Sequence, residues 1–382
     1  MNRTLSVLIP LFVFMASPIW AAFETTAKAA VVIDLGTNTI LIDKQSDVPL
    51  PPASMSKLMT LNMLFEALRD GRITMDTEFG VSKKAHEMGG SKMFLAEGSR
   101  VAVRDLIPGI IVGSGNDACV VVAEGLAGSE EAFARLMTQR AKDLGMEGST
   151  FANASGWPHP LHRMSARDLA FLGARLITEF PEYYGYFSQD SFTWEGITQR
   201  NRNPLLGLGI GADGLKTGHT EEAGYGLVGS ASVGKRRIVF VVSGLTSAAE
   251  RARESEQIVN WSFRQFVEKS LVSKDAVITD VAVWMGEEDQ VNLVAANDLT
   301  VILPALSQDN YKARAVFKSP IEAPVSVGDP LGELIVERDG MSDVRLPLLA
   351  EKEIARGGFG VRMRASAQIL MRKVSETIGG FF

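Results

Sequence analysis

The sequence predicts an α+β fold, in which one antiparallel sheet is flanked by helices and carries an inserted helical lobe. Apolar and polar residues alternate loosely over 29–43, and helical spacing dominates 54–180. Alternating runs return around 215–232 and 236–245, before a helix over about 249–266. Strands at both ends of a helical stretch build a single sheet covered by helices. We expect the cleft to lie between the helical lobe and the sheet.

The chain is long enough for two domains. It has 382 residues, of which 46% are hydrophobic, and this composition allows a sizeable core. Its formal net charge is −6 at pH 7. Because proteins that bind nucleic acids usually carry a basic surface, we expect no nucleic-acid partner.

The N-terminal segment 1–22 has the pattern of a secretory signal peptide. Arg3 precedes an apolar stretch over 5–16, and small residues follow up to Ala21 and Ala22. The apolar stretch is short for a membrane-spanning helix, and an uncleaved anchor is the alternative. The segment therefore predicts that the chain is exported.

A nucleophile and a base are predicted at the start of the first helix. The segment 54–57 reads Ser-Met-Ser-Lys, follows two prolines, and opens an apolar run with helical spacing. Residues three apart share a helix face, so the amine of Lys57 can lie beside the hydroxyl of Ser54. Burial and a second cation at Lys216 are expected to keep Lys57 neutral, so that it can accept the Ser54 proton.

A second Ser-x-x-Lys pattern, Ser232 to Lys235, joins two alternating runs. This position is typical of a hairpin turn, so its lysine is interpreted as an ordinary turn residue. Ser54 and Lys57 remain the candidates.

Two further motifs complete the predicted site. Residues 114–116 read Ser-Gly-Asn. Ser114 is expected to begin a helix and to relay a proton between Lys57 and the leaving amine. Asn116 is expected to form a hydrogen bond with the substrate amide. The Lys-Thr-Gly segment at 216–218 starts a strand. Lys216 and Thr217 offer a cation and a hydroxyl to a carboxylate, and Gly218 permits a ligand to approach the strand edge.

The backbone N–H groups of Ser54 and His219 are the candidate oxyanion donors. His159 and His162 flank prolines in a loop, and we expect no metal site and no cofactor. The single cysteine, Cys119, lies in an apolar run, so we expect a buried thiol rather than a nucleophile and no intramolecular disulfide.

The C-terminal part differs in composition from about Lys274 onward. Short β-type runs separated by turn residues predict a small all-β domain over 275–355, and the runs are 277–284, 290–294, 299–303, 311–317 and 332–336. In the segment 358–382, apolar residues recur at helical spacing and basic residues lie off that face, which predicts a cationic amphipathic helix. Such a helix can lie on a membrane surface, and docking on the β-domain is the alternative.

Extended strings around these motifs resemble the low-molecular-mass penicillin-binding proteins, which are serine-type D-alanyl-D-alanine carboxypeptidases of the S11 type. The strings are PASMSKLMT at 52–60, SGNDAC at 114–119, FANASG at 151–156, SARDLA at 165–170 and DGLKTGHT at 213–220. The resemblance is close over about 25–270, and the β-domain and tail match the layout of the family. One departure is Trp157, where the family usually has a smaller aliphatic residue; this leaves the preference for substrate side chains open.

The resemblance implies a penicillin-recognising serine peptidase fold over 23–270. It implies removal of the terminal D-alanine from peptidoglycan stem pentapeptides and acylation of Ser54 by β-lactams. The implied catalytic residues are Ser54, Lys57, Ser114 and Asn116. The implied substrate-binding residues are Lys216, Thr217, Gly218, His219, Arg202 and Arg251. It also implies attachment of 358–382 to the periplasmic face of the bacterial inner membrane.

An arginine fork suits a free terminal carboxylate, and this favours Arg251 together with Lys216 and Thr217 for that group. For Arg202, an ordinary surface position without contact to the substrate is an equally good interpretation.

Three alternatives use the same residues. A serine β-lactamase needs a carboxylate base for fast deacylation, but Asp168 is the only acid between 150 and 170, at an apparent helix start. A non-catalytic cell-wall binding protein would not form an acyl-enzyme. Endopeptidase action on cross-links cannot be separated by sequence from carboxypeptidase action.

Overall fold

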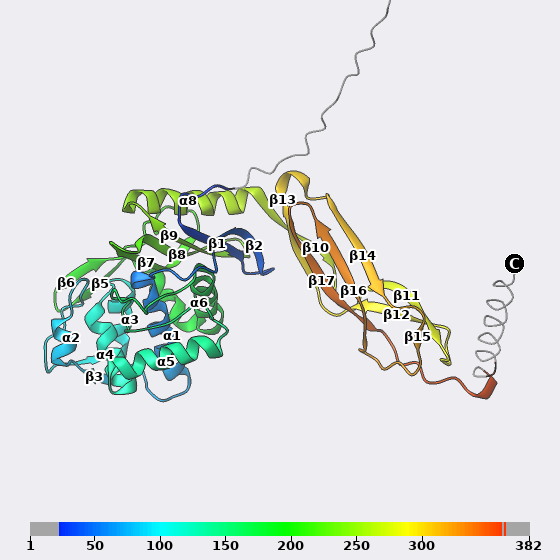
Figure 1. The fold of residues 1–382 in the computed structure, drawn as a ribbon, viewed down its shortest axis with the longest axis horizontal. Coiled ribbons are helices and arrows are strands. Elements are labelled where there is room, and N and C mark those ends of the chain that lie inside the picture. Colours follow the sequence, from blue (N-terminus) through cyan, green and yellow to red (C-terminus); the bar gives the residue numbers. More distant parts are fainter. Residues whose placement is uncertain (1–22, 361–362, 364–382) are drawn as a thin grey trace, which may run out of the picture.

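The computed structural model describes residues 23–360 and Met363. The predicted signal peptide and nearly all of the predicted tail helix lie outside the described residues. Figure 1 shows two units that follow one another along the chain, joined where the long helix α8 (Ala248–Gln265) runs directly into strand β10 (Phe266–Val272). The first unit contains the predicted helical lobe and sheet, and the second is built of strands.

The sheet of the first unit is antiparallel, with the strand order β2-β1-β9-β8-β7. The strands are β1 (Ala29–Asp34), β2 (Thr39–Lys44), β7 (Ala212–Thr220), β8 (Gly224–Val233) and β9 (Arg236–Leu245). The predicted N-terminal hairpin is confirmed as β1 and β2. The prediction of one strand around 215–232 was wrong, because a turn at 221–223 divides it into β7 and β8. Thr220 Oγ1 accepts a hydrogen bond from Ala223 N, and this bond closes the turn.

The two faces of the sheet are covered by different helices. Alternate residues of a strand point to opposite faces. On β9, Val239 and Val241 pack with α6 in the larger core, whereas Ile238 and Phe240 pack against α8. The sheet is therefore a middle layer, with the helical lobe on one side.

The lobe contains short strands and helices between β2 and β7. They are η1 (Ala53–Ser56), α1 (Lys57–Arg69), β3 (Glu78–Gly80), α2 (Lys83–Glu87), β4 (Arg100–Ala102), α3 (Val103–Ile111), α4 (Asn116–Ala127), α5 (Glu130–Asp143), α6 (Ala166–Glu179), α7 (Pro181–Tyr184), η2 (Gly185–Ser188), β5 (Ser191–Trp194) and β6 (Ile197–Arg200). Helices dominate this stretch, as the sequence predicts.

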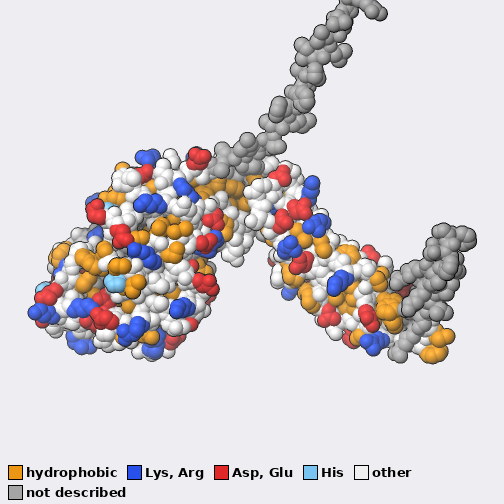
Figure 2. Space-filling view, viewed as in Figure 1, with side chains coloured by type: hydrophobic (Ala, Val, Ile, Leu, Met, Phe, Trp, Pro, Cys, Tyr) orange, Lys and Arg blue, Asp and Glu red, His pale blue; other side chains and the backbone are white. Residues whose placement is uncertain are grey.

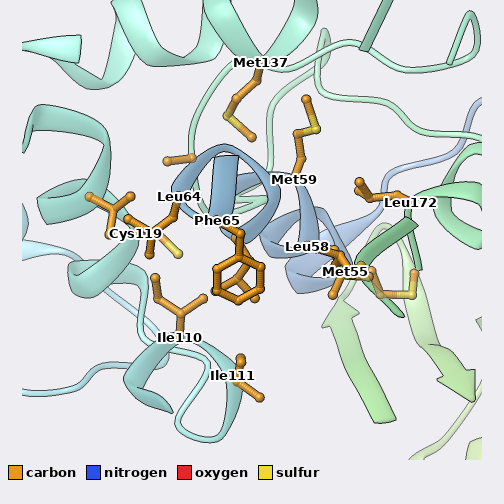
Figure 3. Close-up of a cluster of buried hydrophobic side chains, with 14 of the residues drawn as sticks. Met55, Leu58, Met59, Leu64, Phe65, Ile110, Ile111, Cys119, Met137 and Leu172 are labelled. Atoms are coloured by element: carbon orange, nitrogen blue, oxygen red, sulfur yellow. The ribbon is translucent and has the colours of Figure 1, made fainter. Parts of the chain in front are cut away.

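Helix α1 is the centre of the lobe. Leu58, Leu61, Leu64 and Phe65 are fully buried, and Figure 3 shows side chains from several elements surrounding this helix. Cys119 of α4 is among these side chains, and burial raises the pKa of its thiol to about 12. The expected buried, unpaired thiol is therefore confirmed. A helix enclosed in this way holds its first turn rigidly.

The second unit consists of strands and one short 3-10 turn. Its strands are β10, β11 (Val277–Trp284), β12 (Gln290–Ala295), β13 (Leu299–Pro304), β14 (Tyr311–Phe317), β15 (Ile321–Glu322), β16 (Pro330–Arg338) and β17 (Met341–Ala350), and η3 is Ala305–Ser307. The five predicted runs all lie in strands. Strands β10, β15 and β17 were not predicted. In β17, charged residues and Pro347 interrupt the apolar pattern.

These strands form two sheets. Strands β10 and β13 pair with each other, and the larger sheet has the order β14-β16-β17-β12-β11-β15. Figure 2 shows acidic and basic side chains interspersed over the visible face of both units.

Candidate active site

Ser54 lies in a 3-10 turn directly before α1. The expectation that it belongs to the first turn of the α-helix itself was wrong, because η1 spans Ala53–Ser56 and α1 begins at Lys57. Ala53 has a φ of 48°, so the chain turns sharply before the serine. A Cβ at Gly156 would lie 1.9 Å from Ala53 O. Only glycine at position 156 allows the neighbouring loop to approach this turn.

The amine of Lys57 has three neighbours. Nζ lies 2.8 Å from Ser54 Oγ, 2.7 Å from Asn116 Oδ1 and 2.7 Å from Ser155 O. A neutral amine has two N–H groups and one lone pair. Its two N–H groups can donate to the two carbonyl oxygens, which leaves the lone pair facing the Ser54 hydroxyl. This arrangement suits proton transfer from Ser54 to Lys57.

Burial favours the neutral form of Lys57. The side chain is fully buried, and burial, together with the charge of Arg202, lowers its pKa to about 8. The charges of Lys57 and Lys216 act on each other, as was expected. Arg202 is a further cation near Lys57 that was not expected. Burial also lowers the pKa of Lys216 well below its usual range, and the nearby charge of Lys57 adds to this effect.

The Ser114 loop faces the same crevice. Ser114 has a φ of 59° and its Oγ accepts a hydrogen bond from Lys216 Nζ at 3.0 Å. The expectation that Ser114 begins the following helix was wrong, because Gly115 is the N-cap residue and α4 begins at Asn116. Asn116 Oδ1 accepts from Lys57, and Nδ2 donates to Gly89 O at 2.8 Å, so one amide N–H remains for a ligand.

Lys216 and Thr217 are buried on β7, an edge strand of the sheet. One side of its backbone is therefore left for an added chain. Gly218 lies against the serine turn: a Cβ there would be 2.9 Å from Pro52 O and 3.0 Å from Met55 Cγ. This glycine therefore permits the close approach of η1, and the approach of a ligand at the same position stays a prediction.

Two arginines lie near the crevice and differ in their partners. Arg202 donates to Ser91 Oγ at 2.6 Å and to Gly113 O at 3.1 Å, so it holds the loop that precedes Ser114. Arg251 is buried, its Nε has no hydrogen-bond partner, and its guanidinium lies 5.8 Å from the ring centre of Tyr225. The unpartnered group is the better receptor for a carboxylate.

Comparison with known proteins decides the family. Residues 15–247 match the family model described as D-alanyl-D-alanine carboxypeptidase, and 266–356 match the C-terminal domain of penicillin-binding protein 5. The chain belongs to the D-alanyl-D-alanine carboxypeptidase family. It is similar to the D-alanyl-D-alanine carboxypeptidase DacC of Escherichia coli, with 35% identity over 97% of this chain and 96% of the relative. The family places it among serine-type D-Ala-D-Ala carboxypeptidases, which are hydrolases.

Solved structures agree with this assignment. Penicillin-binding protein 5 from Haemophilus influenzae matches with a TM-score of 0.79 and 33% identity, covering 87% of this chain and 98% of that one. Penicillin-binding protein D2 from Listeria monocytogenes, in an ampicillin-bound form, matches with a TM-score of 0.58 and 30% identity, covering 63% and 98%. The predicted α+β fold with a C-terminal all-β domain is therefore confirmed.

Several residues of this carboxypeptidase site were not predicted. Ser155 O and Gly89 O fix Lys57 and Asn116, but main-chain acceptors leave no trace in residue type. Ser56 lies 2.7 Å from His162 Nε2, which anchors η1 to the loop before α6. The string at 151–156 was the signal that could have identified Ser155.

The buried His162 makes folding depend on pH. Burial lowers its pKa to about 3, below the ordinary value of 6.5, so the folded state keeps it neutral. Its contribution to stability is full above pH 6.5 and is lost as the pH falls toward 3, by about 1.4 kcal/mol per pH unit. We expect His162→Gln to flatten this dependence in urea unfolding between pH 7 and 4, whereas His159→Gln on the exposed side of the loop should not. An unchanged slope in His162→Gln would contradict this account.

The described residues also bear on metal binding and on membrane crossing. In 23–360 and Met363, no group of three or more His, Cys, Asp or Glu side chains is arranged to hold a metal ion. Among the same residues, no helix is both long and apolar enough to cross a bilayer.

Proposed function

We propose that this carboxypeptidase removes the terminal D-alanine from peptidoglycan stem pentapeptides through an acyl-enzyme on Ser54. The observation that carries the proposal is the contact set of Lys57, whose amine lies beside Ser54 Oγ and between two carbonyl acceptors. Lys57 takes the Ser54 proton as Oγ attacks the carbonyl carbon of the last peptide bond. The backbone N–H groups of Ser54 and His219 are the proposed oxyanion donors.

The leaving group needs a proton, and Ser114 is the proposed relay. The Ser114 hydroxyl oxygen accepts a hydrogen bond from Lys216 Nζ. This bond leaves the hydroxyl proton of Ser114 directed toward the crevice. The bond between the two D-alanines breaks, D-alanine leaves as the amine, and Lys57 recovers its neutral form through Ser114. Water then cleaves the Ser54 ester, and the shortened peptide is released with a new carboxylate.

The substrate is proposed to bind as an added strand. Edge strand β7 offers backbone groups to an extended peptide, with Thr217 at its side. The terminal carboxylate is proposed to meet Arg251, Lys216 and Thr217. Several cationic groups converge on this crevice, since the charges of Lys57, Arg202 and Arg251 all act on Lys216. An anionic chain end relieves their mutual repulsion.

Replacement of Arg251 tests the carboxylate role. We expect Arg251→Gln to raise KM for an acylated D-Ala-D-Ala peptide about 10- to 100-fold, the range for a charge-assisted hydrogen bond. Cleavage of the same peptide as its terminal amide should change little between variant and wild type. Arg253→Gln, an exposed neighbour on α8, is the matched control. Equal losses on acid and amide substrates would contradict the role of Arg251.

β-Lactams are proposed to acylate Ser54, and hydrolysis of the resulting acyl-enzyme is proposed to be slow. The nearby carboxylate of Asp117 accepts the N–H groups of Met93, Phe94 and Leu95. Asp168 accepts from Ser149 Oγ. Carboxylates engaged in this way are poor general bases, and this argues against a β-lactamase. One experiment separates the alternatives: D-alanine release from a pentapeptide and the lifetime of the penicillin adduct are measured on the same enzyme. Release of D-alanine with a persistent adduct supports a carboxypeptidase. Fast penicillin turnover supports a β-lactamase, and the absence of an adduct supports a passive binder.

The domain division and cellular location are also proposals. We infer a signal peptide at 1–22, a catalytic domain at 23–270, a β-rich domain at 275–355 and a membrane-anchor helix at 358–382, which hold the enzyme at the periplasmic face of the inner membrane. The exposure of Phe359 and Met363 supports contact of the tail with lipid. Deletion of 358–382 should move the protein from the membrane fraction to the soluble fraction.

A further inference from the structure

Tyr225 on β8 contacts two residues of the proposed site. Its ring stacks on the imidazole of His219, with ring centroids 3.9 Å apart and an angle of 29° between the planes. The guanidinium carbon of Arg251 lies over the ring of Tyr225, 5.8 Å from its centre. The backbone of His219 supplies a proposed oxyanion donor, and Arg251 is the proposed receptor for the terminal carboxylate. One ring therefore joins the residue at the scissile carbonyl to the residue at the chain end.

The place of Tyr225 is fixed relative to the serine turn. Tyr225 lies directly opposite His219 in the pairing of β7 with β8. Its neighbour Gly226 packs against η1, since a Cβ there would lie 2.7 Å from Met55 Cε. Met55 directly follows the proposed nucleophile. Because close-packed segments do not shift independently, the ring of Tyr225 keeps a constant distance from the reaction centre.

Helix α8 is held on both sides of Arg251. Figure 1 shows that this helix runs across β8 and β9, and it contacts both strands. Thr26 Oγ1 donates to Glu250 Oε1 at 2.7 Å, and Thr25 Oγ1 donates to Glu254 Oε2 at 2.8 Å. These bonds fix the helix and engage the acidic side chains that neighbour Arg251 in sequence. The charge of Arg251 is thus left for a ligand.

An aromatic ring is well suited to hold an arginine that must bind a carboxylate. A carboxylate accepts from the N–H groups in the plane of the guanidinium, and hydrogen bonds within the protein would engage those same groups. The face of a ring attracts the cation and leaves its in-plane N–H groups to the ligand. Among the described residues, the buried Nε of Arg251 has no hydrogen-bond partner. The ring contact is therefore the means of orientation that the structure offers.

We propose that Tyr225 is a positioning residue, whose ring holds the guanidinium of Arg251 at a set distance from the oxyanion donors. The inference rests on the proposed function, in which Arg251 binds the terminal carboxylate. Without the ring, Arg251 keeps its charge but is less well ordered, so part of the binding energy at the chain end is lost. A peptide that ends in an amide does not form this ion pair, and its cleavage depends little on Tyr225.

The preference for a free chain end tests this role. It is measured as the ratio of kcat/KM for an acylated D-Ala-D-Ala peptide to kcat/KM for its terminal amide. We expect Tyr225→Leu to lower this ratio about 3- to 10-fold, the range for a cation on a ring face. Tyr225→Phe should keep the ratio within about twofold, because the ring remains. In an Arg251→Gln background, Tyr225→Leu should not change the ratio further.

A fluorinated ring and a matched control separate this role from a merely structural one. Trifluorinated phenylalanine at position 225 keeps the shape of the ring but weakens its negative face, so the ratio should fall between the values for phenylalanine and leucine. Tyr311 on β14 has a similar contact, with Lys269 Nζ 5.2 Å from its ring centre. Tyr311→Leu should keep the wild-type ratio.

Two results would overturn the role of Tyr225. One is a folded Tyr225→Leu enzyme that keeps the wild-type ratio. The other, which holds even if Tyr225→Leu folds poorly, is an equal ratio for phenylalanine and trifluorinated phenylalanine at position 225. A wild type that releases no D-alanine, or an Arg251→Gln enzyme that keeps the preference for the free chain end, would instead refute the proposed function.

Discussion

Ser54→Ala is expected to lose essentially all activity, by about 10⁴-fold or more in D-alanine release, because no other group can form the acyl-enzyme. Its hydroxyl lies 2.8 Å from Lys57 Nζ, in the turn η1 that leads directly into the buried helix α1. Intact mass after penicillin treatment measures the same step directly. The wild type should gain one penicillin, and the variant should gain none.

Ser232 supplies the matched control for this prediction. It belongs to the second Ser-x-x-Lys pattern, at the end of β8, where the chain turns into β9. Ser232→Ala should keep both the adduct and D-alanine release. A penicillin adduct on Ser54→Ala, or loss of the adduct in Ser232→Ala, would show that the nucleophile is misassigned.

Lys57→Arg is expected to lower the acylation rate about 10³-fold. Arginine is always protonated in proteins and offers no lone pair to the Ser54 proton. Lys57→Met should have a similar effect, because it removes the amine while it keeps most of the buried volume. The rate of penicillin acylation is measured for each variant, together with its thermal unfolding, since Lys57 is fully buried.

Lys235→Arg in the β8–β9 turn is the control for that substitution. It should acylate at the wild-type rate. If a folded Lys57→Arg variant keeps acylating, then Lys57 is not the base and another group must take the Ser54 proton.

The sequence predicted much of this site, because each motif lies within or directly before an element that a local pattern identifies. The expected start of the strand at Lys216 was wrong, since β7 begins at Ala212. Apolar spacing placed Ser54 and Lys57 before a buried helix, and alternation placed Lys216 on a strand. The turn residues around Ser232 also explained why the second Ser-x-x-Lys pattern is a hairpin. These are local signals, and they do not depend on how the elements pack.

The remaining features depend on tertiary contacts. Gly218 is required by the approach of Pro52 O, and no property of the strand sequence reveals that neighbour. Asn116 is engaged by Lys57 and Gly89, so its amide is mostly used within the protein. Arg202, which is distant in sequence, is a further cation that acts on Lys57.

The central claim is that a neutral Lys57 accepts the Ser54 proton, and the pH dependence of penicillin acylation tests it most directly. Since the pKa of Lys57 is about 8, its neutral fraction grows as the pH rises through that value. The second-order acylation rate should therefore rise about tenfold per pH unit below 8 and level off above it. A rate that stays flat between pH 6 and 9, or that falls as the pH rises, would contradict the account.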